Sequence, residues 1–142
     1  MSPLESRACV FLLGLCPSYA VYFALQIAAP AWLSTTPERM ACLAVAAGAH
    51  AAICVIGLLV IKRRERGEGL LADERDRAIE ARATRIAYYA LMVGAVLAGM
   101  VMPFNNGGWR IVNTALLAIV IAEGLRNVLI MRAYRGTPRL AY

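Results

Sequence analysis

The sequence predicts an all-α integral membrane protein, a four-helix bundle of two helical hairpins with the third helix extended into the cytoplasm. Hydrophobic residues make up 61% of the 142 residues and gather into four long runs. A helix that spans a bilayer needs about 20 apolar residues, and each run supplies nearly that many or more. The predicted spans are residues 8–33, 41–61, 86–104 and 111–131. We expect a single transmembrane domain over residues 1–142, with no separate soluble domain.

The first two spans are expected to form a hairpin, because only the short polar turn STTPERM with Pro37 separates them. Within the first span, Pro17 and Pro30 should bend or end the helix, since proline lacks a backbone N–H and clashes with the preceding turn. Leu15 stands where a lipoprotein cleavage site before Cys16 would need a small residue, and the apolar run continues well beyond it. We therefore expect this span to be retained rather than cleaved.

The third span continues a charged segment without interruption. Residues 70–85 read LLADERDRAIEARATR and pass into the apolar run with no proline or turn signal. We predict one continuous helix from Leu71 to Phe104, about 50 Å long at the usual rise per residue. The Gly-rich turn NNGGWR joins the last two spans. Its Trp109 is expected at the same membrane face as Trp32, as in an aromatic belt.

The distribution of basic residues predicts the orientation of the chain. Eight basic residues lie in the middle segment 62–85 and three in the C-terminal tail, whereas the two hairpin turns hold only Arg39 and Arg110. The positive-inside rule then places both termini and the middle segment in the cytoplasm. The net charge of +6 is therefore better explained by membrane orientation than by binding of nucleic acid.

Small residues recur at helical spacing in two spans and are expected where helices pack closely. The second span carries the stripe Ala46, His50, Cys54 and Gly57, and the third carries the pairs Gly94–Ala98 and Ala95–Gly99. Small side chains let two backbones approach, which favours helix association in lipid. Cysteine is expected to be small apolar filler here, because the four cysteines form no C-x-x-C pair.

The two halves of the chain resemble each other. Residues 21–27, VYFALQI, resemble residues 87–93, AYYALMV, and residues 57–67 resemble residues 126–136. A duplicated hairpin would give a parallel repeat about an axis along the membrane normal. Because the matches are short and similar in composition to many spans, duplication and chance similarity both remain open.

Glu123 is the strongest candidate for an intramembrane polar site, because a carboxylate is costly in hydrocarbon and usually faces a partner. It lies about 12 Å from the cytoplasmic end of the last span, one turn before Arg126 and Asn127. Two interpretations follow. Glu123 either carries a coupled proton or cation, or forms a structural pair with Arg126, and the nearby counter-ion favours the structural pair.

His50, near the middle of the second span, and Gln26, in the first, complete the set of intramembrane polar candidates. A histidine at this depth can serve as a haem ligand, a proton relay or a quinone contact. The chain has no second histidine, so we favour a buried His50 bonded to a neighbouring polar group. We predict no catalytic residue, no metal site and no bound cofactor.

The charged segment before the third span is the candidate contact surface for a partner. Its five residues are Asp73, Glu74, Arg75, Asp76 and Arg77. Acidic and basic side chains three and four apart stabilise an exposed helix, so this segment is either a solvated helix start or a docking surface. Because acid and base alternate so evenly, direct contact with nucleic acid is not expected.

The motif Asp73-Glu74-Arg75-Asp76, followed by Ile79 and by Tyr88-Tyr89 at the start of a span, resembles a family of small prokaryotic membrane proteins of unknown function. The resemblance covers mainly residues 70–131. It implies four spans with a D-E-R-(D/E) motif before the third, and a prokaryotic plasma (inner) membrane location. It also implies, from members encoded beside small helix-turn-helix regulators, a cytoplasmic regulatory protein as partner.

Three functions are compatible with these features. We favour a non-enzymatic membrane scaffold or signalling partner that acts through its charged cytoplasmic helix. A small dimeric proton-coupled transporter using Glu123 is an alternative, and a haem- or quinone-binding redox subunit using His50 is another. The expected partners are the lipid bilayer, with a second copy of the chain or a cytoplasmic regulatory protein as further candidates.

Overall fold

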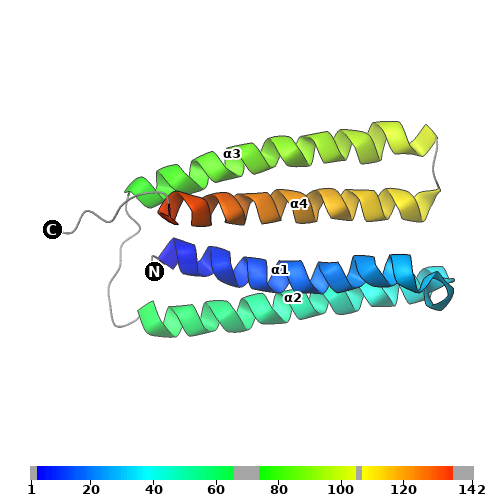
Figure 1. The fold of residues 1–142 in the computed structure, drawn as a ribbon, viewed down its shortest axis with the longest axis horizontal. Coiled ribbons are helices and arrows are strands. Elements are labelled where there is room, and N and C mark those ends of the chain that lie inside the picture. The colour runs from blue at the N-terminus through cyan, green and yellow to red at the C-terminus, as the bar shows by residue number, and fades with distance from the viewer. Residues whose placement is uncertain (1–2, 66–73, 105–106, 136–142) are drawn as a thin grey trace. The chain divides into compact units, whose positions relative to one another are not determined.

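The computed structural model describes residues 3–65, 74–104 and 107–135 of the chain. This described part is helical and contains no strand, which confirms the predicted all-α class. Four of its helices are long and apolar enough to cross a membrane. Residue contacts divide the chain into two units, Met1–Leu70 and Leu71–Tyr142, and each unit contains one antiparallel helical hairpin (Figure 1).

The first hairpin consists of α1 (Pro3–Ala28) and α2 (Thr36–Glu65), joined by a 3₁₀ turn over Pro30–Leu33. The predicted first span continued to residue 33, but the α-helix ends at Ala28. Proline explains the difference, because Pro30 has no N–H for the helical hydrogen bond. Pro17, in contrast, lies inside α1.

A local hydrogen-bond network starts α2. The Glu38 carboxylate accepts bonds from the Thr35 backbone N–H, at 2.9 Å, and from the Ser34 hydroxyl, at 3.3 Å. An acidic side chain three residues after the helix-capping position satisfies a backbone N–H that the helix itself leaves unpaired. The Arg39 Nε donates to the Leu33 carbonyl oxygen at 2.6 Å. The side chains of Glu38 and Arg39 therefore bond back to the start of the polar turn predicted from STTPERM and to the residue before it.

Two glycines let α1 and α2 approach closely. A Cβ added at Gly57 of α2 would overlap the Val10 side chain of α1, and one added at Gly14 of α1 would lie 3.0 Å from His50 Cδ2. Cys54, on the same stripe of α2, is buried. The predicted stripe of small residues thus packs against α1 at Gly57 and Cys54, as expected for helix association by close backbone approach.

The second hairpin consists of α3 (Glu74–Val96) and α4 (Gly108–Arg135). After α3 the chain stays helical through a π-helical turn, Leu97–Val101, and a 3₁₀ turn, Met102–Phe104. Pro103 explains the change, since it lacks the N–H of a regular turn, and the Met102 N–H instead bonds the Leu97 carbonyl, five residues back. Helical structure is continuous from Glu74 to Phe104, and the earlier part of the predicted helix, residues 71–73, lies outside the described residues.

Only one of the two small-residue pairs in the third span packs against α4. A Cβ added at Gly94 would overlap the Ala118 Cβ and lie 3.4 Å from the Ala118 Cα, whereas one added at Gly99 would meet nothing within 4 Å. Ala98 is buried and Ala95 is exposed. The contact with α4 therefore uses the Gly94–Ala98 pair.

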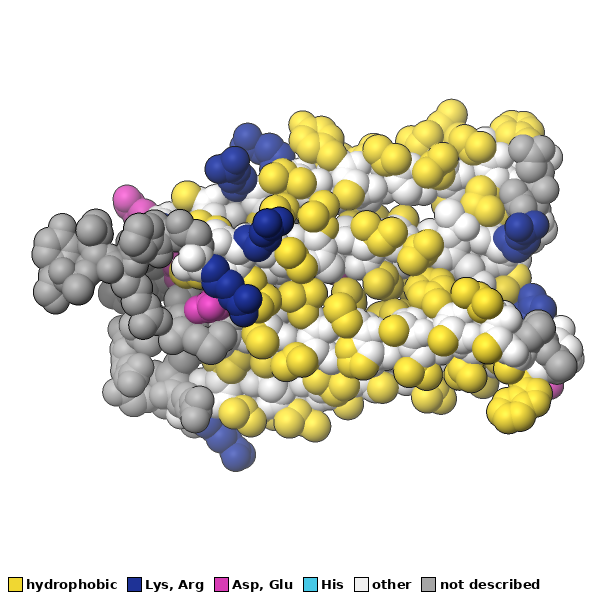
Figure 2. Space-filling model, viewed as in Figure 1, with side chains coloured by type: hydrophobic (Ala, Val, Ile, Leu, Met, Phe, Trp, Pro, Cys, Tyr) yellow, Lys and Arg dark blue, Asp and Glu magenta, His cyan; other side chains and the backbone are white. Residues whose placement is uncertain are grey.

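Apolar side chains cover the helices along most of their length, and many of them are exposed, as Figure 2 shows for one face. A soluble domain of this size would bury such side chains, whereas a lipid environment accepts them. Trp32, at the turn of the first hairpin, is also exposed, and Trp109 lies in the first turn of α4, beside the turn of the second. Both tryptophans thus lie at hairpin turns, where the sequence places an interface.

Candidate functional site

Polar side chains join α3 to α4 at the open end of the second hairpin, which we define as the N-terminal part of α3 together with the C-terminal part of α4. Asp76, Glu80 and Thr84 follow one another at intervals of four residues on α3. Residues at this spacing lie on one face of a helix. All three contact side chains of α4, so we call them the α3 polar stripe.

Arg126 of α4 binds two members of this stripe. Its Nη2 lies 2.6 Å from the Glu80 Oε1, and its Nε donates to the Thr84 hydroxyl at 3.2 Å. The Arg126 side chain is 28% exposed and that of Glu80 45%. A charge-assisted hydrogen bond at this distance is among the stronger polar contacts in proteins, although partial exposure reduces its net contribution. Arg126 is therefore the main polar link between the two helices.

Tyr134 of α4 makes the third contact, nearer the end of the hairpin. Its hydroxyl donates a hydrogen bond to the Asp76 carboxylate. The Arg75 guanidinium carbon lies 6.0 Å from the centre of the Tyr134 ring, a distance at which a cation is attracted by the aromatic face. Two residues of the predicted contact motif, Arg75 and Asp76, are therefore engaged within the chain itself.

The structure changes the expected relation between Glu123 and Arg126. A Glu123 Oε2 lies 3.8 Å from the Arg126 Nη1, so the predicted pair exists, but the Arg126–Glu80 contact is much shorter. The Glu123 side chain is 49% exposed. Asn127 is buried, and its side-chain amide donates to the Glu123 backbone carbonyl at 2.8 Å rather than to the carboxylate. Tertiary packing thus directs Arg126 away from its sequence neighbour.

Gln26 and His50 lie in the first hairpin, on α1 and α2 respectively. The Nε2 atoms of both side chains are buried and have no hydrogen-bond partner among the described residues. The His50 ring packs edge-on against Tyr19, with ring centres 5.6 Å apart. The expected bond between His50 and a neighbouring polar group is therefore not formed through Nε2; an aromatic contact and the close backbone of Gly14 surround the ring instead.

The remaining residues of the predicted contact motif have different environments. Glu74 and Arg77 are exposed on the first turns of α3, and Asp73 lies outside the described residues. The described residues contain no group of three His, Cys, Asp or Glu side chains that could hold a metal ion. The motif therefore divides into residues that bind α4, Arg75 and Asp76, and residues that remain available on the surface, Glu74 and Arg77.

Sequence reasoning missed Glu80, Thr84 and Tyr134 as members of this polar cluster. The regular spacing of Asp76, Glu80 and Thr84 was available in the sequence and predicts a shared face of α3. The identity of their partners could not be predicted from the sequence, because Arg126 and Tyr134 are more than 40 residues away in the chain. Only the antiparallel pairing of α3 with α4 brings them together.

Arg126 should couple energetically to Glu80 more strongly than to Glu123. A double-mutant cycle of Glu80→Gln with Arg126→Gln, read as the free energy of unfolding in detergent micelles, should give a coupling of about 1 kcal/mol. The matched cycle of Glu123→Gln with Arg126→Gln should give only a few tenths of a kcal/mol. A larger coupling for Glu123 would show that the sequence-adjacent pair is the structural one after all.

Comparison with known proteins agrees with the membrane character of the chain. A family model described as a predicted membrane protein, DUF2178, matches residues 9–137. This match is wider than the resemblance seen in residues 70–131 and extends over both hairpins. No curated protein and no solved structure matches the chain.

Proposed function

Because the chain belongs to the DUF2178 family of predicted membrane proteins, we propose that it is a non-enzymatic scaffold or signalling partner in the membrane, and that the first turns of α3 are its contact surface. The observation that carries the proposal is the set of side-chain contacts at the open end of the second hairpin. Asp76, Glu80 and Thr84 hold the charged part of α3 against α4. A surface on a supported helix loses less conformational entropy on binding than one on a free helix.

The exposed charges of this surface support a polar partner. Glu74 and Arg77 lie three residues apart on α3 and are exposed, while their neighbours Arg75 and Asp76 contact Tyr134. An acidic and a basic group held in fixed positions provide orientation and specificity for a partner with complementary charges. We propose a cytoplasmic regulatory protein or a second copy of the chain as that partner.

Reversing the exposed charges should abolish the association and leave the hairpins intact. We expect Glu74→Lys and Arg77→Glu each to lose the proteins that wild type retains in affinity capture from a detergent extract, because like charges now face each other across the interface. Arg135→Glu is the matched control, since Arg135 is also exposed at the open end but lies on α4. Asp76 is unsuitable for this test, because its reversal would also break the contact with Tyr134.

The proposal is contradicted if both α3 variants retain every captured protein at the wild-type amount. It is also contradicted if Arg135→Glu causes the same loss as the α3 variants. The effect would then follow from net charge rather than from the position of the residues. Membrane insertion of each variant, measured by resistance to alkaline extraction, provides the check that the spans are unaffected.

The orientation that this function needs has both termini in the cytoplasm of a prokaryotic plasma membrane. The distribution of basic residues supports this orientation, because segment 62–85 and the C-terminal tail together hold eleven and each hairpin turn holds one,. In the described structure Arg39 and Arg110 lie next to the hairpin turns, whereas Lys62, at the other end of α2, lies far from its turn. The contact surface on α3 is then available to cytoplasmic proteins.

Cysteine labelling should show this orientation directly. In a background without the four native cysteines, Ser34→Cys and Gly107→Cys should react with an impermeant maleimide added outside intact cells, because both residues lie in hairpin turns. Lys62→Cys is the matched control and should react only after the membrane is opened. Labelling of Lys62→Cys from outside, with protection of the two turn positions, would reverse the proposed orientation.

The two other functions remain predictions. Transport through Glu123 requires a carboxylate that can exchange a proton, and Glu123 is half-exposed beside Arg126. Redox function through His50 requires a cofactor beside its imidazole ring. In the described structure Tyr19 and Gly14 lie next to this ring. A visible absorption spectrum of the purified protein tests the haem alternative.

A further inference from the structure

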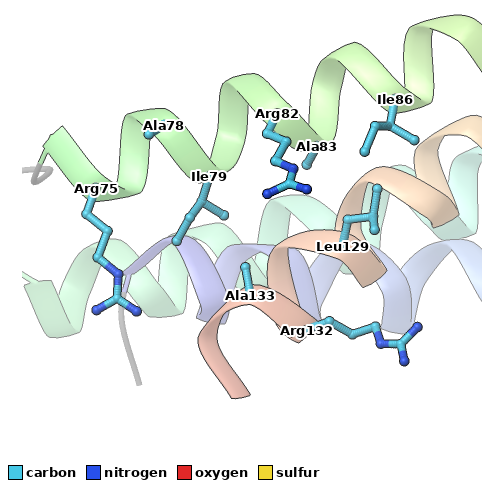
Figure 3. A pocket seen from close by; sticks show the side chains of 9 residues that line it. All are labelled: Arg75, Ala78, Ile79, Arg82, Ala83, Ile86, Leu129, Arg132 and Ala133. Carbon is cyan, nitrogen blue, oxygen red and sulfur yellow. The ribbon is translucent and has the colours of Figure 1, made fainter. Parts of the chain in front are cut away.

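A groove between α3 and α4 combines three arginines with an apolar wall. Its volume is about 550 Å³, within the range of pockets that hold small ligands. Arg75, Arg82 and Arg132 contribute the charge, and the remaining lining residues are Ala78, Ile79, Ala83, Ile86, Leu129 and Ala133. Figure 3 shows Ile79 and Leu129 between the two helices and the Arg82 guanidinium turned toward α4. Among the residues that the structure describes, no carboxylate lines the groove.

The groove lies on the other flank of the α3–α4 contact from Glu80 and Thr84. Along α3, Arg82 is two residues away from both Glu80 and Thr84. Its side chain therefore leaves the helix about 200° of rotation away from theirs, on nearly the opposite side. The acidic side chains nearest to Arg82 on α3 bind other residues: Glu80 binds Arg126, and Asp76 binds Tyr134. Arg82 and Arg132 are exposed and form no ion pair with any residue in the described ranges. Their charge is available to an anion from outside the chain.

The position of the groove along α3 matches the surface of a membrane. Ile86, at its apolar end, is the first residue of the predicted third span, and the exposed Tyr88 and Tyr89 follow directly. Tyrosine is typical of the headgroup level of a bilayer. Arg75 and Arg82 lie on the polar side of this level. The headgroup of an amphiphile in the groove would therefore lie near the arginines, and its apolar part would lie along the apolar wall.

We propose that this groove binds an anionic phospholipid. The headgroup phosphate would bind at the Arg82 guanidinium, which is turned toward α4, and the exposed Arg132 side chain would turn from its present direction to join it, since guanidinium groups bind phosphate oxygens through paired hydrogen bonds. The upper part of an acyl chain would lie along Ile79, Ile86 and Leu129. Basic pockets between membrane helices are a known form of lipid recognition, and the combination of free positive charge with an apolar wall at this depth fits a lipid better than a soluble anion.

Native mass spectrometry of the full chain in detergent micelles tests the site. Wild type should retain phosphatidylglycerol in preference to phosphatidylcholine. Arg82→Gln combined with Arg132→Gln should lower the affinity for phosphatidylglycerol about tenfold or more, because each cation near the headgroups contributes substantially to binding. The matched control is Arg85→Gln combined with Arg135→Gln, which removes the same charge from one exposed position on each of α3 and α4 outside the groove and should keep most of the affinity.

Three results would overturn the proposal. Equal loss in the control variant would show that net charge alone attracts the lipid. Equal displacement of the bound lipid by millimolar inorganic phosphate would show a site for a soluble anion. Absence of any preference for phosphatidylglycerol in wild type would show that the groove holds no anionic lipid. Arg132→Gln alone, a single change at an exposed position of α4, gives the same test if the double variant does not fold.

Discussion

Gly94→Ala is expected to lower the free energy of unfolding by about 1–3 kcal/mol relative to the same change at Gly99. The new methyl group at position 94 would overlap the Ala118 Cβ and approach the Ala118 Cα. An alanine side chain has no rotamer with which to yield, so the backbones of α3 and α4 must separate. Alanine favours a helix more than glycine does by about 1 kcal/mol, and the comparison with Gly99 cancels that gain.

Gly99→Ala is the matched control because its methyl group would meet nothing within 4 Å. Gly94 lies in α3 and Gly99 in the π-helical turn that continues it, and both variants add one methyl group to the same apolar span. The second control is the exchange variant, Gly94→Ala with Ala118→Gly, which moves the methyl group across the interface and should recover most of the stability. Unfolding in detergent micelles, followed by circular dichroism, measures all four proteins. Equal stability of the Gly94 and Gly99 variants would contradict the α3–α4 packing.

Gly57→Ala should destabilise the first hairpin by about 1–2 kcal/mol relative to Gly48→Ala, which adds a methyl group to α2 in open space,. The methyl group at position 57 would overlap the Val10 side chain of α1. Valine prefers one χ1 rotamer in a helix, so its side chain cannot turn away without cost. The effect should nevertheless be smaller than at Gly94, because the obstacle is the end of a side chain.

Removing the obstacle should restore the first hairpin. In the Val10→Ala background, Gly57→Ala is expected to cost little or nothing, so the two changes should be strongly non-additive. The same unfolding measurement gives all three free energies. If the effects of Gly57→Ala and Val10→Ala simply add, the two residues are not in contact and the close approach of α1 and α2 at this point is wrong.

The helices and their number could be predicted from the sequence, because each is specified locally. Long apolar runs must become helices in lipid, where the backbone can bond only within its own segment. Local signals also explain the main boundary, since Pro30 ends the regular helix of the first span. The π-helical turn before Pro103 was not predicted, because proline indicates a disturbance but not which hydrogen-bond pattern replaces the regular one.

Hydrophobic length by itself determined an all-α membrane protein with four apolar helices, and a resemblance over residues 70–131 suggested a family of small membrane proteins of unknown function. Which polar and small residues meet was decided only by the tertiary structure. Gly94 and Gly99 are equally good packing residues in the sequence, and Arg126 has an acidic neighbour, Glu123, one turn away. The antiparallel pairing of α3 and α4 selects Gly94 for the interface and Glu80 for Arg126. The physical reason is that helix formation depends on neighbours in the chain, whereas packing depends on the rotation and register of two helices, which no single segment specifies.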